Sequence, residues 1–330
     1  MKKILYSLIA VLAMVMSSCS NDDIEITRAI SVKVNPSGVI APFTYEINDG
    51  ELESFSTKYK LRVHTFAYNE KGLLVAQDIQ YLKNYASIAN CNLNLEKGTY
   101  TLVAVTDVAE IDGNNVKTVF WKFSDTEKIS TTKITDAGLL GGKYKILGLD
   151  IKSITIGDNN NECNLNPKSV GALCLVQWFN VHTFPSVEKY TLAMSKSCDF
   201  LQLNESNGYE ISEKNENGAF NWRLSYIEPS NYTSNNLYEY YFMLPMKNIN
   251  FKYTYVENGS TNTLFDPQTV SFEAGGEYWF ALDLCDEDKN NNITRSYGVL
   301  LNGTNSVKEY STKAKNRNNL NTLYLVDYAK

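Results

Sequence analysis

The chain contains two histidines, and each lies in its own copy of the tetrapeptide Val-His-Thr-Phe. These are Val63-His64-Thr65-Phe66 and Val181-His182-Thr183-Phe184, a repetition that suggests a paired metal site. A metal site needs further ligands, and the sequence offers no third ligand at a metal-binding spacing. We therefore expect ordinary strand or loop histidines, with no metal and no cofactor.

An acidic run near the C-terminus begins like a calcium loop, with oxygen donors at alternate positions of Asp286-Glu287-Asp288-Lys289-Asn290. Asn291 then stands where the sharp turn requires Gly, and Tyr297 stands where a bidentate Glu belongs. The run therefore predicts a solvated hairpin loop, and so does Asp158 to Glu162.

Signatures of nucleophilic catalysis are weak. Two S-x-x-K matches occur, Ser130 to Lys133 and Ser186 to Lys189, without the S-D-N or K-T-G companions of acyl-enzyme chemistry. The sequence has no G-x-S-x-G, no glycine-rich phosphate loop and no H-E-x-x-H. The sequence does not exclude a pair of carboxylates, far apart in the chain, that would cleave glycosides. It contains no positive indication of an enzyme.

Aromatic side chains could instead stack on sugar rings. Along the predicted strand at 278–284, Tyr278, Phe280, Leu282 and Leu284 share one face, and Trp279 lies on the other. Trp279 is therefore the tryptophan best placed for glycan contact, and a surface glycan-binding lipoprotein is the alternative function. Packing at a sheet edge is the structural alternative for this residue.

The first nineteen residues read as an export signal with a lipid attachment site. Lys2 and Lys3 precede a short apolar stretch from Ile4 to Val15, too short to span a bilayer. Met16-Ser17-Ser18-Cys19 resembles a bacterial lipobox, so we expect cleavage between Ser18 and Cys19 and acylation of Cys19. Several acyl chains would hold the protein firmly on a membrane. The alternative is a plain secretory signal with an incidental cysteine.

The five remaining cysteines are scattered and odd in number, namely Cys91, Cys163, Cys174, Cys198 and Cys285. They show neither a disulfide framework nor CxxC metal spacing, and the sequence does not say which of them pair. We expect mostly buried thiols.

Composition favours a folded β protein. The 330 residues are 43% hydrophobic, and their net charge of −6 gives no basic stripe for nucleic acid. Period-2 patterns dominate, with no convincing amphipathic helix. The clearest hairpin runs from Tyr59 to Phe66, turns at Asn69-Glu70-Lys71-Gly72 and resumes at Leu73. Further strands are predicted at 99–106, 116–123, 144–149 and 151–156.

A polar stretch at 158–162, closed by Asn166-Pro167, places a domain boundary between residues 164 and 165. The second half contains short strands separated by Asn, Gly and Asp, a spacing typical of antiparallel sandwiches. We predict a signal peptide at 1–18, a tether at 19–28, and two β-sandwich domains at 29–164 and 165–330. The segment Glu96-Lys97-Gly98-Thr99-Tyr100 is similar to residues 273–278, which suggests an internal duplication.

The first half resembles the fimbrillin superfamily of type V pili, especially its anchor and accessory subunits. The resemblance lies in the lipoprotein signal, the acidic Asp22-Asp23 after the lipid site, the hairpin from Leu61 to Val75 and the strand from Gly98 to Ala104. It implies an all-β fold of two tandem transthyretin-like (Greek-key) sandwiches. It also implies a surface-exposed lipoprotein of the cell outer membrane that joins other fimbrial subunits by β-strand addition and contributes to adhesion.

Two segments could take part in strand exchange, Ile24 to Val34 and Leu320 to Tyr328. For each, a native edge strand of its own domain is the alternative. In the fimbrillin superfamily, stalk subunits are cut after an early Arg or Lys, which makes Arg28 the candidate processing site. A cut there releases only residues 19–28, so the sequence favours a retained anchor.

Overall fold

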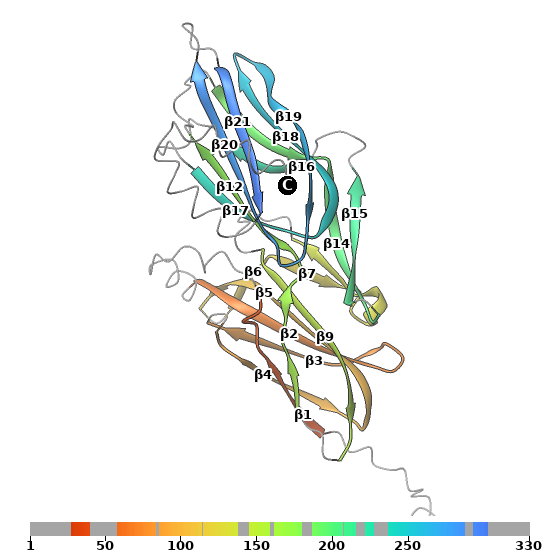
Figure 1. Ribbon diagram of the computed structural model, residues 1–330. Coiled ribbons are helices and arrows are strands. Elements are labelled where there is room, and N and C mark those ends of the chain that lie inside the picture. Colours follow the sequence, from red (N-terminus) through yellow and green to blue (C-terminus); the bar gives the residue numbers. More distant parts are fainter. Residues whose placement is uncertain are drawn as a thin grey trace, which may run out of the picture.

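A computed structural model describes residues 28–39, 58–83, 86–113, 115–137, 145–158, 162–179, 187–206, 208–215, 222–227, 237–287 and 293–302. Within these ranges the chain is built from strands, with one short 3-10 helix at Ile129–Thr131. The all-β prediction is confirmed. Figure 1 shows strands of the first half below those of the second half.

Two sheets are built mainly from the first half, and β11 of the second half joins one of them. A small sheet has the order β10 (Glu162–Leu165), β1 (Arg28–Val34), β4 (Ala89–Leu95). A central sheet has the order β11 (Lys168–Ser169), β9 (Leu147–Ile156), β5 (Gly98–Asp112), β2 (Tyr59–Asn69), β3 (Leu74–Leu82), and β6 (Asn115–Val119) also pairs with β5.

A third sheet joins strands from both halves of the chain. This bridging sheet has the order β15 (Gly208–Asn215), β14 (Lys196–Asn204), β8 (Lys133–Asp136), β7 (Trp121–Ser124). The second half adds the sheet β17 (Leu237–Met243), β12 (Ala172–Phe179), β20 (Glu277–Glu287), β21 (Ile293–Asn302). It also adds the sheet β16 (Trp222–Ile227), β13 (Val187–Met194), β18 (Met246–Glu257), β19 (Ser260–Phe272).

The central sheet is buried on both faces, which explains the nearly continuous burial along β2. Leu61 and Val63 pack with the small sheet, in a core that includes Ile30 and Val32. Phe66 and Tyr68 point the other way, into a core shared with the bridging sheet. A strand covered on both sides needs apolar residues at successive positions, and β2 supplies them.

The predicted hairpin at Asn69 to Gly72 is present. The side-chain oxygen of Asn69 accepts hydrogen bonds from the backbone N–H groups of Lys71 and Leu73, both at 3.0 Å. Gly72 has φ +70°, a conformation that a residue without Cβ adopts freely. The local turn chemistry was therefore readable from sequence.

Contacts cross the predicted domain boundary. Leu201 of β14 pairs with Ile134 of β8, and the core around Phe66 also includes Leu203 and Phe242. The boundary between residues 164 and 165 stays a prediction, as does the count of two tandem sandwiches. What the contacts establish is that the two halves share a sheet and a core.

Two strand pairs are parallel, although antiparallel sandwiches were expected. β1 runs parallel to β10, and β12 runs parallel to β20. Parallel neighbours require a long crossover connection, and both pairs are far apart in sequence, so short-range hairpin signals could not reveal them. Residues 147–156 also form a single strand, whereas 115–124 are split into β6 and β7 at Phe120.

Candidate assembly site

The first described strand, β1, is held on both sides. Its register places Val32 opposite Cys91 of β4 and Cys163 of β10. Ile30, Val32 and Val34 are fully buried in the core beneath the central sheet. Their alternation with polar residues is the pattern of a strand with one face inward. β1 is therefore an internal strand of its own sheet.

Burial of these three side chains fixes β1 in place. Each fully buried Val or Ile contributes roughly 1.5–3 kcal/mol relative to exposure. At the surface, Lys33 forms an ion pair with Glu162 at 3.2 Å, but both side chains are largely exposed and the pair contributes little. Apolar packing and the two backbone ladders thus hold the strand.

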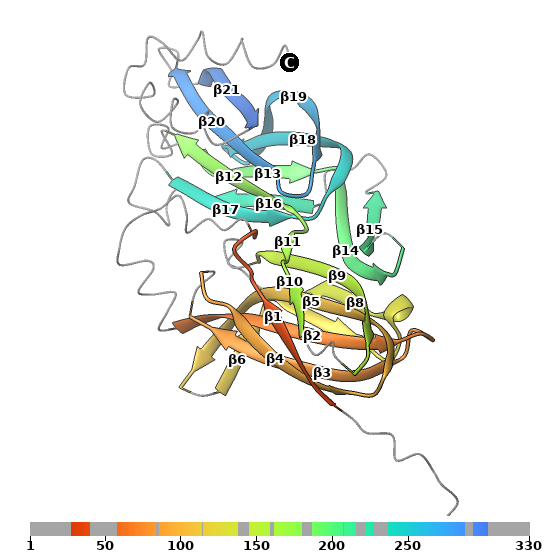
Figure 2. The same cartoon turned by 60° about the horizontal axis from the view of Figure 1, so that its bottom comes forward.

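Arg28, the candidate processing residue, is the first residue of β1. Its backbone pairs with Leu95, at the far end of β4. The opposite end of β1 leads to Asn35, whose N–H donates to the Leu165 carbonyl, and to Gly38, which bridges to Lys168. Figure 2 shows that β1 begins at the end of the first half that lies away from the second half. Whether Arg28 is cut stays a prediction.

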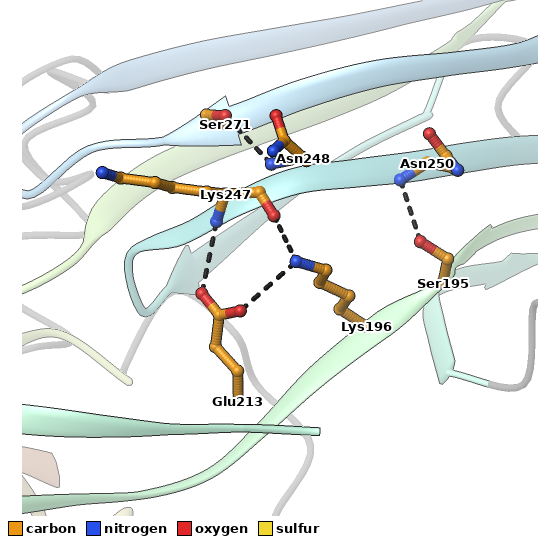
Figure 3. A network of polar contacts seen from close by, with 7 residues as sticks. All are labelled: Ser195, Lys196, Glu213, Lys247, Asn248, Asn250 and Ser271. Carbon is orange, nitrogen blue, oxygen red and sulfur yellow. Dashed lines mark hydrogen bonds and ion pairs between the residues drawn. The ribbon is translucent and has the colours of Figure 1, made fainter. Parts of the chain in front are cut away.

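The bend between β13 and β14 is clamped to β18. Ser195 donates its backbone N–H to the Asn250 carbonyl at 3.0 Å and accepts the Asn250 N–H on its hydroxyl oxygen at 2.9 Å. Lys196 binds both Glu213, at 3.3 Å, and the Lys247 carbonyl. Glu213 in turn accepts the Lys247 N–H at 3.3 Å. Figure 3 shows this network, which joins the bridging sheet to β18.

His64 is a buried core residue. Its ring stacks on Phe66 with 3.9 Å between centroids and meets Phe123 edge-on. The Nε2 atom lies 3.1 Å from the Gln77 side-chain oxygen. Burial lowers the pKa of His64 to about 4, so the ring is neutral at pH 7. This environment suits packing, and His182 lies outside the described residues.

Three of the four cysteines with described side chains are buried, and all four are free thiols. Burial raises the pKa of Cys91, Cys163 and Cys174. A thiol that resists deprotonation is a poor nucleophile. The expectation of mostly buried thiols holds for this set, and the side chain of Cys285 is not described.

In the first S-x-x-K match, Ser130 is exposed and Lys133 has other partners. The Ser130 carbonyl accepts a hydrogen bond from the Gln202 amide. The Lys133 ammonium lies 3.7 Å from Asp125 and 5.0 Å from the Phe200 ring centroid. Asp125, Lys133 and Gln202 border an open depression of about 660 Å³. Lys133 is engaged with a carboxylate and an aromatic ring, an ordinary surface arrangement.

Several predicted site residues lie outside the described part of the chain. These are Ser18 and Cys19, the segment Leu320 to Tyr328, and most of the acidic run that begins at Asp286. Trp279 belongs to β20, where its backbone lies between Leu175 and Leu301, but its side chain is not described. Glycan contact through Trp279 stays a prediction.

Within the described ranges, no group of three or more His, Cys, Asp or Glu residues is arranged to hold a metal ion. The described part of the chain also lacks a helix long and apolar enough to cross a membrane.

Sequence reasoning missed the two strands that flank β1. β4 reads Ala89-Asn90-Cys91-Asn92-Leu93-Asn94-Leu95, with perfect alternation of buried and exposed residues. That period-2 pattern was the available signal, and its small and Asn residues concealed it. β10 is four residues long and carries no comparable signal.

Comparison with known proteins gives structural matches alone. No family model matches the chain, and no curated protein matches it in sequence. A candidate adhesin from Bacteroides thetaiotaomicron is 10% identical, covers 83% of this chain and 96% of its own, and has a TM-score of 0.47.

Two further solved structures are matched over most of both chains. The fimbrial anchor protein Mfa2 from Porphyromonas gingivalis is 8% identical, with 84% of this chain and 100% of that chain covered and a TM-score of 0.38. A candidate polysaccharide-binding protein from B. thetaiotaomicron is 8% identical, with coverages of 84% and 99% and a TM-score of 0.43. Such distant likenesses carry no argument about what this chain binds.

Proposed function

We propose that this protein is a surface-exposed lipoprotein of the cell outer membrane that serves as a fimbrial anchor or accessory subunit. Cys19 carries the lipid, and the tether 19–28 leads directly into β1. The supporting observation is that β1 is buried between β4 and β10. While the chain is uncut at Arg28, this buried strand joins the lipidated tether to the folded first half.

The direction of β1 supports this arrangement. The nine residues from Cys19 to Thr27 span at most roughly 30 Å when extended. Because β1 begins at the end of the first half away from the second half, the second half is presented away from the membrane. Other fimbrial subunits would bind there or at free sheet edges by strand addition, and adhesion is a further role.

The proposal is tested in cells. Wild-type protein should incorporate radiolabelled palmitate, fractionate with the outer membrane and be accessible to surface labelling. Cys19→Ala should abolish the label and release the protein, and Cys91→Ala should change neither result. Deleting the gene should alter pilus length or retention on the cell. Unlabelled protein in the cytosol, or unchanged pili after deletion, would overturn the proposal.

A further inference from the structure

Strand β1 lies between the tether and the rest of the folded chain. Residues 19–27 end at Arg28, the first residue of β1, and residues 35–39 continue from the other end of the strand. The side chain of Val39 is buried in the core that includes residues of both halves. A pull on the tether therefore reaches the folded protein through β1.

Strand β10 leads from the first half into the second. It ends at Leu165, and the chain continues through β11 into β12. Between these two strands, the Val170 N–H donates to the Leu147 carbonyl of the central sheet at 3.0 Å. A pull on the second half therefore enters the first half at the C-terminal end of β10.

Strands β1 and β10 run in the same direction, so the two pulls act on opposite ends of a parallel pair. The alignment extends from Ser31, opposite Glu162, to Gly38, which bridges to Lys168. Figure 2 shows β1 running from the outer end of the first half towards the second half. The tether pulls β1 by its N-terminal end, and the second half pulls β10 by its C-terminal end. For parallel strands, this combination slides one strand along the other, which is a shear load.

A shear load acts on all the ladder hydrogen bonds of β1 at once. All seven residues from Arg28 to Val34 pair with β4, and four of them also pair with β10. One backbone hydrogen bond contributes only about 1 kcal/mol net, but the bonds of a sliding strand must break together. Peeling from one end would break the same bonds in succession, at a lower force. Forced detachment is governed by the unfolding barrier, which is higher when the bonds break together.

The inward side chains of β1 also oppose sliding. A slip of one residue would turn Ile30, Val32 and Val34 out of the core. A slip of two residues would restore the alternation, but it would bring Pro36, which lacks an N–H, to the position of Val34. Neither register is a favourable stopping point, so β1 should leave its sheet in one step.

We propose that β1 is a force-bearing strand. A pull between the tether and the second half loads its ladders with β4 and β10 in shear, and these ladders resist detachment of the tether. The parallel pairing of β1 with β10 is the feature that places the two pulled ends at opposite ends of the pair. This inference rests on the proposed lipid at Cys19 for the direction of the pull, but the strength of the strand is a property of the fold.

Force spectroscopy on the full chain from Cys19, without lipid, compares two directions of pull. The first handle is always at the N-terminus. In the shear experiment the second handle is at Ser260, which is exposed at the start of β19 in the second half. In the peeling experiment it is at Lys97, close to Leu95, the β4 partner of Arg28. That pull separates β1 from β4 one residue pair at a time.

Release of β1 is recognised by its length. It frees the chain up to β2, so the step is an extension of up to roughly 100 Å, the length of residues 28–57 when extended. The force of this step should be several-fold higher in the shear experiment than in the peeling experiment. Equal forces in the two directions would overturn the proposal. This comparison uses the unaltered fold and needs no destabilised variant.

Two neighbouring substitutions test which contacts resist the pull. Val32→Ala removes buried methyl groups and should lower the shear force, whereas Lys33→Ala alters an exposed side chain and should not. Equal shear forces for the two variants would contradict a load carried by the buried face of β1. Because the tested chain has no lipid, a failure here leaves anchoring at Cys19 untouched. Conversely, an absence of palmitate in cells would leave the measured shear strength unchanged.

Discussion

Arg62 and Asp107 form a bidentate ion pair in the interior of the central sheet. The Arg62 Nε and Nη2 atoms lie 2.7 and 2.6 Å from the two Asp107 carboxylate oxygens, and Nη2 also donates to the Trp121 carbonyl at 2.9 Å. The side chains are 9% and 0% exposed. Burial raises the pKa of Asp107 to about 6, against the opposing effect of Arg62. The pair links β2, β5 and β7.

Removing one partner of this pair should be costly. Asp107→Asn would leave the buried Arg62 guanidinium without its counter-charge, and we expect a loss of about 3–5 kcal/mol in the free energy of unfolding. Urea denaturation at pH 7.5 measures it. Arg62→Met combined with Asp107→Leu should recover most of the loss.

The exposed pair Lys33–Glu162 provides a matched control, since its side chains are 45% and 66% exposed. Lys33→Ala should change stability by less than about 0.5 kcal/mol. A loss below about 1 kcal/mol for Asp107→Asn would mean that the interior ion pair is dispensable.

His64 should make stability pH-dependent. Burial lowers its folded-state pKa to about 4 from the usual 6.5, so the unfolded chain binds more protons between these values. The contribution is therefore present above pH 6.5 and is lost as pH falls towards 4. Relative to His64→Phe, the wild-type protein should lose roughly 2–3 kcal/mol between pH 7 and 4.5.

The comparison with His64→Phe isolates this group. Asp107 titrates with the opposite sign, because its raised pKa makes stability fall as pH rises from about 4 to 6. That contribution is common to both proteins and cancels in the difference. Parallel pH profiles of unfolding free energy would contradict a neutral, buried His64.

What could be read from sequence was local. The Asn69–Gly72 turn and the strands beside it depend on neighbouring residues, and both were predicted correctly. The Arg62–Asp107 pair spans 45 residues, and the alignment of Val32 with Cys91 and Cys163 depends on a crossover. Alternation identifies a strand and its inward face, but does not say which strand lies beside it.

At the candidate site, too, the sequence predicted the local strand but not its long-range partners. The alternating pattern around Arg28 correctly predicted a strand, and the structure gives its bounds as Arg28–Val34. In the structure β1 pairs with β4 and β10 of the same chain, so it is a native strand, but it lies inside the sheet and not at its edge. An intersubunit role for this segment stays a prediction. Its flanking strands come from residues 89–95 and 162–165, which no short-range signal connects to β1.

The shared core should make the two halves unfold together. Leu201 of β14 is fully buried beside Ile134 of β8 in the bridging sheet. Leu201→Ala should cost about 2–5 kcal/mol and shift the unfolding of both halves equally. Hydrogen exchange in denaturant, read on β2 and β18, measures this. The exposed Lys214→Ala on β15 is the control, and separate transitions would show that the halves are independent.

Close packing at Gly148 should exclude any side chain. A Cβ there would lie 2.4 Å from both the Thr106 hydroxyl and a Val39 methyl group. Gly148→Ala should therefore destabilise the protein by roughly 1–3 kcal/mol through overpacking. Gly157→Ala, where nothing lies within 4 Å, should change stability by less than about 0.5 kcal/mol. Similar thermal midpoints for the two variants would refute the close approach.

Truncation from the N-terminus should separate the tether from the strand. A chain beginning at Ala29 keeps Ile30, Val32 and Val34 in place, so its urea midpoint should match that of a chain beginning at Cys19. A chain beginning at Asn35 loses all three buried side chains, at roughly 1.5–3 kcal/mol each, and opens the ladders of β4 and β10. It should bind a hydrophobic dye and expose Cys91 and Cys163 to thiol reagents, and a peptide of residues 28–35 should reverse both changes. Rapid thiol labelling in the chain that begins at Ala29 would mean that β1 needs the tether to stay bound, and a cut at Arg28 would then release it.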